Sequence, residues 1–274
     1  MSFVTAPDTD AYFLQGATFT DDTGTVWTDF TATRHTVSPW GPDLQHGAPP
    51  SALVTHVLEQ SVPEGGRLVR VTTELLGAVP VDRLRATARV VRPGRRISYL
   101  EAVVTDSAGR EVVRGSGWWI RSTDTRELEN PDVPSASDLV PWEQCTEAET
   151  FLTAWKSPYI DTLETRAAER QLWVRSAVPV VAGAEDTPWT RLMSVADVAN
   201  GIDRVLDPAQ WLFMNTDLTV ALHRLPDGPW TAVRAEANVG PDGVGLTVGR
   251  LYDRRGPVGT TTQSLLVQEL TPVR

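Results

Sequence analysis

Cysteine and lysine are almost absent from this sequence of 274 residues. Cys145 is the only cysteine, so the chain can form no intramolecular disulfide. Lys156 is the only lysine, which leaves nearly all of the positive charge on arginine. The formal net charge is −10, and this argues against nucleic acid and against an anionic membrane surface as partners.

Long hydrophobic runs are missing as well. No apolar stretch approaches the roughly 20 residues that a membrane-spanning helix needs. The N-terminal stretch MSFVTAPDTDAYFLQG has no basic segment followed by an apolar one, so we expect no signal peptide and a cytoplasmic location. The four histidines are scattered without the spacing of metal ligands, so neither a metal ion nor another cofactor is expected.

The sequence contains one pattern of elements twice. In each half, apolar residues at helical spacing predict one helix, and alternating β-branched segments with turn residues between them predict four strands. The first helix is expected at residues 50–60, with strands at 67–80, 84–91, 96–106 and 111–120. The second helix is expected at residues 189–207, with strands at 211–226, 231–239, 244–253 and 258–270.

Three matched positions support an internal repeat. When Pro80 is aligned with Pro226, Pro93 nearly meets Pro241 and Asp106 nearly meets Asp253, at an offset of about 147 residues. A polar segment rich in Pro, Ser and Asp separates the halves, and this composition predicts a linker. We therefore predict an α+β fold with an N-terminal unit over 1–121, a linker over 122–150 and a C-terminal unit over 151–274. In each unit an antiparallel sheet wraps one helix, and the two sheets pair edge to edge.

This order of elements resembles the double hot-dog fold. The ordered segments GPDLQHGAPPSALV, NTDLTVALHR, AEANVG and TTTQSLLVQ resemble the acyl-CoA thioesterase II family over nearly the whole chain apart from the linker. The resemblance implies hydrolysis of acyl-CoA to a free acid and CoA, without a metal ion or a covalent intermediate. It also implies a homo-oligomer.

In that family an Asp, a hydroxyl residue and a Gln bind and activate a water. The resemblance places the Asp at Asp217 and the Gln at Gln263, while the hydroxyl position falls on Asn238. Asn can still hold a water through its amide. Asp217 lies in an apolar strand, where burial would raise the pKa of a carboxyl group. Each of the three also fits a structural position, in a turn or on a solvent-facing strand.

The stretch HGAPP at the start of the first helix is the candidate oxyanion site. Gly47 would let a substrate approach the backbone, and the amides of Gly47 and Ala48 lie at the positive end of the helix. His46 could contact the substrate. The plainer interpretation is a loop followed by a helix whose first turn tolerates proline.

Two other functions stay open. A decayed acyl-CoA-binding protein would fit the Asn at position 238. An acyl-thioester hydratase would need a His beside an acid, and in the sequence Asp197 in the second helix has no His near it.

Overall fold

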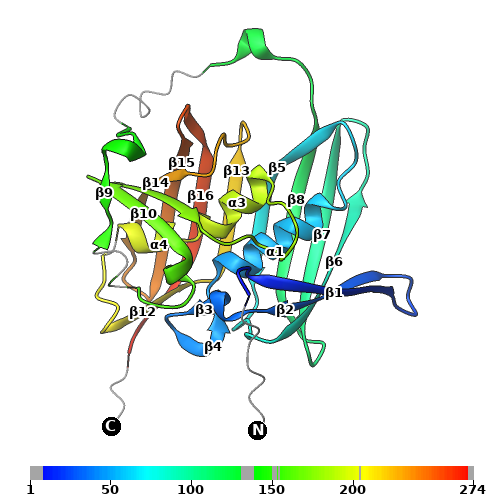
Figure 1. Ribbon diagram of the computed structural model, residues 1–274, viewed down its shortest axis with the longest axis horizontal. Coiled ribbons are helices and arrows are strands. Elements are labelled where there is room, and N and C mark those ends of the chain that lie inside the picture. Colours follow the sequence, from blue (N-terminus) through cyan, green and yellow to red (C-terminus); the bar gives the residue numbers. More distant parts are fainter. Residues whose placement is uncertain (1–8, 131–138, 150–152, 154, 204, 271–274) are drawn as a thin grey trace.

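The computed structural model describes residues 9–130, 139–149, 153, 155–203 and 205–270. Among these, one antiparallel sheet of 14 strands dominates, in the order β1-β2-β6-β7-β8-β5-β13-β16-β15-β14-β11-β10-β9, with β12 also paired to β16. Figure 1 shows the sheet curving around the helices. The helices of the described residues that matter here are α1 (Ala48–Glu59), α3 (Pro188–Ala196) and α4 (Ala199–Ile202). No helix in this part of the chain is long and apolar enough to cross a membrane.

Within the described residues, each half supplies eight strands. The first half contains β1 (Phe13–Thr20), β2 (Val26–Ala32), β3 (Val37–Ser38), β4 (Gly41–Gln45), β5 (Gly66–Leu75), β6 (Arg83–Arg92), β7 (Ile97–Asp106) and β8 (Glu111–Arg121). The second half contains β9 (Thr146–Glu147), β10 (Leu163–Ala168), β11 (Gln171–Ser176), β12 (Trp211–Asn215), β13 (Asp217–Leu222), β14 (Thr231–Val239), β15 (Val244–Asp253) and β16 (Gly256–Glu269). The short strands β3 and β4 form a separate pair that leads into α1.

The two halves join where β5 pairs with β13. Thr72 lies opposite Thr219 in this pair, and their hydroxyl oxygens are 3.0 Å apart. These two residues are also separated by 147 residues in the sequence, the offset of the internal repeat. The pair therefore lies on an approximate two-fold axis between the halves, and the expected edge-to-edge joining of the sheets is present.

Helix α1 is buried along almost its whole length. Pro49 and Pro50 occupy the first turn, where their missing N–H groups cost nothing, and the helix packs on β5 to β8. Helix α3 begins with Thr187, whose hydroxyl accepts from the amide of Thr190. Each half thus has a helix wrapped by its own sheet, as predicted.

Two predicted elements are broken in the structure. The single helix expected over 189–207 ends at Asp197 and resumes as α4. The single strand expected over 211–226 is divided at Thr216 into β12 and β13. Both interruptions lie in the same place in the fold, and this place is the candidate site.

The helices α1 and α3 pack side by side in opposite directions (Figure 1). At one end, the hydroxyl of Thr187 donates to the carboxylate of Glu59. Burial raises the pKa of Glu59 to about 7 from its ordinary value of 4.5. The folded state therefore holds this proton more tightly than the unfolded state does, so the stability contribution is lost as the pH rises through about 7.

We expect Glu59→Gln to remove this pH dependence. Gln keeps an acceptor for Thr187 but cannot ionise, so the gain in melting temperature over the wild type should be larger at alkaline pH than at acidic pH. Thermal unfolding at several pH values measures this. Glu64→Gln, at an exposed carboxylate, is the control and should show no such trend. An equal gain at all pH values would contradict the prediction.

Candidate active site

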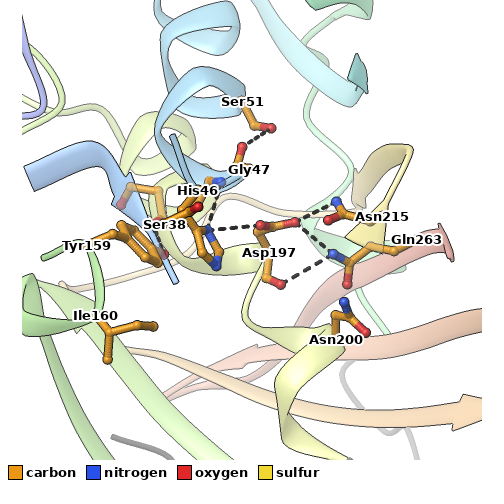
Figure 2. Close-up of polar contacts among 12 residues, drawn as sticks. Ser38, His46, Gly47, Ser51, Tyr159, Ile160, Asp197, Asn200, Asn215 and Gln263 are labelled. Carbon is orange, nitrogen blue, oxygen red and sulfur yellow. Dashed lines mark hydrogen bonds and ion pairs between the residues drawn. The ribbon is translucent and has the colours of Figure 1, made fainter. Parts of the chain in front are cut away.

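A buried carboxylate, that of Asp197, lies at the centre of the molecule. Asp197 caps the C-terminus of α3, and only 4% of its side chain is exposed. Figure 2 shows polar side chains from both halves converging on it. A charged group so far from water needs partners, and its two oxygens have different ones.

One oxygen, Oδ1, is held by two side-chain amides. It accepts from Nδ2 of Asn215 at 2.8 Å and from Nε2 of Gln263 at 2.7 Å. Burial raises the pKa of Asp197 to about 6, while the hydrogen bonds from Asn215 and Gln263 act in the opposite direction. The carboxyl group is therefore mostly ionised at neutral pH and is still basic enough to take up a proton.

The strand interruption at Thr216 explains how Asn215 reaches this position. Asn215 lies opposite Leu265 and Thr219 lies opposite Thr262, so a step of four residues on one strand faces a step of three on β16. One extra residue reverses the inward and outward alternation, as a β-bulge does. Asn215 consequently points to the helices together with Gln263.

The same bulge turns Asp217 to the other face of the sheet. Its neighbours Leu218 and Val220 are buried, whereas Asp217 is only half-buried, and its Oδ1 accepts from the backbone amide of Ser264. Asn238 is exposed on β14, in the row of Leu246 on the outer face. The structure therefore does not bring Asp217 and Asn238 together with Gln263, because strand alternation places them on opposite faces.

The first half contributes His46 to the same cluster. Nδ1 of His46 is 3.1 Å from Oδ2 of Asp197. The imidazole stacks on Tyr159 with 4.1 Å between ring centroids, and the Tyr159 hydroxyl donates to the carbonyl of Ser194. Burial lowers the pKa of His46 to about 3. The ring is thus neutral at physiological pH, so the contact with Asp197 is not an ion pair.

Gly47, the N-cap residue of α1, faces the second oxygen of Asp197. A Cβ atom at Gly47 would lie 2.7 Å from Oδ2, so only glycine leaves this approach open. The Gly47 amide donates to no acceptor within the described residues. The Ala48 amide, which we predicted to be free, donates instead to Nδ1 of His46 at 3.2 Å. One free amide, at the positive end of the helix, therefore remains for an oxyanion.

A cavity of about 240 Å³ opens beside this cluster. Its polar end includes His46, Asp197 and Asn215, and most of the remaining wall is apolar. The apolar residues that line it are Pro39, Trp40, Leu44, Leu75, Ala78, Val79, Trp155, Ile160, Val198, Met214 and Leu266. A mostly apolar cavity with a few convergent polar groups is typical of a site for a small organic substrate.

The cluster contains two residues that were not predicted for the site, and it lacks two that were. Of the residues predicted for the site, the structure brings together His46, Gly47 and Gln263 and leaves out Asp217 and Asn238, and it adds Asp197 and Asn215. It also places a His beside Asp197, although 151 positions separate them in the sequence. No group of three or more His, Cys, Asp or Glu side chains among the described residues is arranged to hold a metal ion.

Two family models match the chain. The acyl-CoA thioesterase N-terminal domain matches residues 36–120, and the acyl-CoA thioesterase C-terminal domain matches residues 129–267. The chain belongs to the acyl-CoA thioesterase family. This thioesterase is accordingly a thioester hydrolase, as predicted. No curated protein sequence gives a significant match.

Solved structures confirm the fold of the thioesterase. A hot-dog protein of unknown function from Alicyclobacillus acidocaldarius has a TM-score of 0.69 at 14% identity, covering 96% of this chain and 98% of its own. An acyl-CoA thioesterase II from Mycobacterium marinum has a TM-score of 0.64 at 11% identity, covering 94% and 97%. A trans-AT PKS dehydratase domain from Brevibacillus brevis has a TM-score of 0.57 at 13% identity, covering 93% and 98%. The predicted double hot-dog, α+β fold is confirmed.

Proposed function

We propose that this chain hydrolyses acyl-CoA thioesters with a water molecule activated by Asp197. The observation that supports this is the unequal environment of the carboxylate. Oδ1 is fixed by Asn215 and Gln263, whereas Oδ2 faces the unhindered Cα of Gly47 beside the cavity. Oδ2 is thus the oxygen that can accept a proton from water next to a bound thioester.

The remaining requirements of thioester hydrolysis are met nearby. The attacking water needs a base, and a positioned base contributes about 10²- to 10⁴-fold to the rate. The developing oxyanion needs a donor, and the free Gly47 amide at the N-terminus of α1 supplies one, worth roughly 3 kcal/mol of barrier. In this proposal Asp197 and Asn215 take the places first assigned to Asp217 and Asn238, while Gln263 and Gly47 keep theirs.

The pH dependence of the reaction should report the ionisation of Asp197. Because only the carboxylate can accept a proton, we expect kcat/KM to rise with pH and to level off above a midpoint of about 6. Gln263→Ala removes a donor that stabilises the ionised form, so its midpoint should lie at higher pH than that of the wild type. A pH profile of kcat/KM for both proteins measures this. A variant midpoint at or below that of the wild type would count against the assignment.

Release of free CoA thiol from a panel of acyl-CoAs, from short to long chains, tests the proposed function directly. Turnover in the wild-type protein supports it. Saturable binding of acyl-CoA without turnover across the panel would instead favour the binding-protein alternative. The chain lengths that are hydrolysed would also show how the apolar cavity wall selects its substrate.

Reversible hydration of a 2-enoyl thioester is a second candidate function. The observation that favours it is the contact between His46 and Asp197, since such enzymes need a His beside an acid and the sequence alone showed none. Loss of the enoyl absorbance without release of thiol would identify this reaction. A homo-oligomer in the cytoplasm stays a prediction.

A further inference from the structure

Nδ1 of His46 makes two contacts that require different protonation. The backbone amide of Ala48 donates to it, so this nitrogen must offer a lone pair. Oδ2 of Asp197 lies 3.1 Å from the same nitrogen, and an ionised carboxylate would meet that lone pair unfavourably. Both contacts are satisfied when Oδ2 carries a proton and donates it to Nδ1. The contacts of Nδ1 therefore suit the protonated form of Asp197, which exists just after it has taken a proton from water, whereas the hydrogen bonds from Asn215 and Gln263 suit the ionised form that precedes it.

The other ring nitrogen of His46 faces the cavity. When Nδ1 is an acceptor, the proton of a neutral imidazole is on Nε2. Within the described residues Nε2 has no hydrogen-bond partner, the His46 side chain is 15% exposed, and the ring lines the cavity. Figure 2 shows the imidazole of His46 between Tyr159 and Asp197. His46 thus presents an N–H donor to whatever occupies the cavity.

We propose that His46 protonates the departing thiolate of the substrate. This inference rests on the proposed hydrolysis. Water attacks the thioester carbon, a C–O bond forms, and the water proton moves to Oδ2 of Asp197. When the C–S bond breaks, the sulfur takes the proton from Nε2 of His46, and Nδ1 takes the proton from Oδ2. The products are the acid and the free thiol, with Asp197 ionised again and His46 in its other neutral tautomer. Exchange with water then restores the first tautomer.

A donor is useful here because a thiolate would otherwise form in a mostly apolar cavity. Placing an unpaired anion in such surroundings is costly. Tyr159 is the other titratable group in contact with the His46 ring, and burial raises the pKa of its phenol well above the ordinary value, so it stays neutral. The stacking holds the ring plane, which keeps Nε2 directed into the cavity.

Two thioesters with the same acyl group and different thiols test this assignment. One carries N-acetylcysteamine, an alkyl thiol like that of CoA, and the other carries 4-nitrothiophenol, whose thiolate departs without a proton. We expect His46→Gln to lower kcat about 100-fold for the first and by less than about threefold for the second, because only the alkyl thiolate needs the donor. A purely structural role, or a role in binding the oxyanion, would lower both rates equally, and that result would overturn the proposal.

The wild-type protein provides a test that does not depend on a variant that folds. Across alkyl and aryl thioesters, a thiolate that is protonated as it departs gives rates that change little with the pKa of the thiol. A steep increase in rate as the pKa of the thiol falls would overturn the proposal. Hydrolysis of neither thioester, nor of acyl-CoA, by the wild type would instead overturn the proposed function, so the two failures are distinguishable.

Discussion

Asp197→Asn is expected to lower kcat for acyl-CoA hydrolysis about 1000-fold, within the range measured for loss of a positioned base. Asn cannot accept the water proton, yet it has nearly the same shape and keeps an oxygen for the amides of Asn215 and Gln263. The substitution also removes a charge that is costly to bury. The variant should therefore melt no lower than the wild type, and thermal unfolding measured beside the kinetics separates lost chemistry from lost folding.

Asp217→Asn is the matched control for this variant. It changes the same carboxylate to the same amide 20 positions further along the chain, on the outer face of the sheet. Its kcat should stay within about threefold of the wild type, as for most substitutions away from a site. The reverse pattern, with Asp217→Asn inactive and Asp197→Asn active, would restore the assignment made from the sequence.

Gly47→Ala is expected to lower kcat/KM about 100-fold. The backbone of Gly47 has helical angles, φ −65° and ψ −26°, which alanine adopts without strain. The added Cβ, however, would lie 2.7 Å from Oδ2 of Asp197 and 3.2 Å from its Cγ, so the carboxylate has to move. A displacement of about 1 Å in a reacting group can cost 10²-fold in rate. Steady-state kinetics on the preferred acyl-CoA measures the effect.

Gly77→Ala is the control for crowding of the cavity. Gly77 lines the same cavity, but a Cβ there would meet no atom within 4 Å. We expect its kcat/KM to stay close to that of the wild type. If both glycine variants retain full activity, the approach to Asp197 past Gly47 is not the route of the substrate.

Much of the fold could be predicted because its signals are local. Strand alternation and turn residues located the strands of both halves, and the prolines at the start of α1 marked that helix correctly. The bulge at Thr216 could not be predicted, since one extra residue in a run of apolar and polar side chains leaves the pattern plausible in either phase. Asp217 was assigned from the family resemblance and its apolar surroundings, and that single extra residue is why Asn215 rather than Asp217 points to the helices.

The site was harder to predict than the fold. Asp197 had a usable signal, a lone acid within the apolar run LMSVADVAN, but an acid at the end of a helix is also an ordinary surface feature. The contact between His46 and Asp197 joins different halves of the chain, and no local pattern specifies it. Asn238 was assigned from the family resemblance, and the alternation of β14 places it on the outer face.

The approximate two-fold relation through Thr72 and Thr219 also bears on how many sites the molecule carries. Following the pairing of β5 with β8 and of β13 with β16, Gly117 occupies in the first half the position that Gln263 occupies in the second. A Cβ at Gly117 would lie 2.9 Å from the side chain of Leu68, so a glutamine there would require Leu68 to move. Two identical halves would carry two equal sites. In this chain Asp197 and the two amides that hold it, those of Asn215 and Gln263, all lie in the second half. The chain thus combines two halves of similar fold, as two subunits of a dimer would, with a single proposed active site.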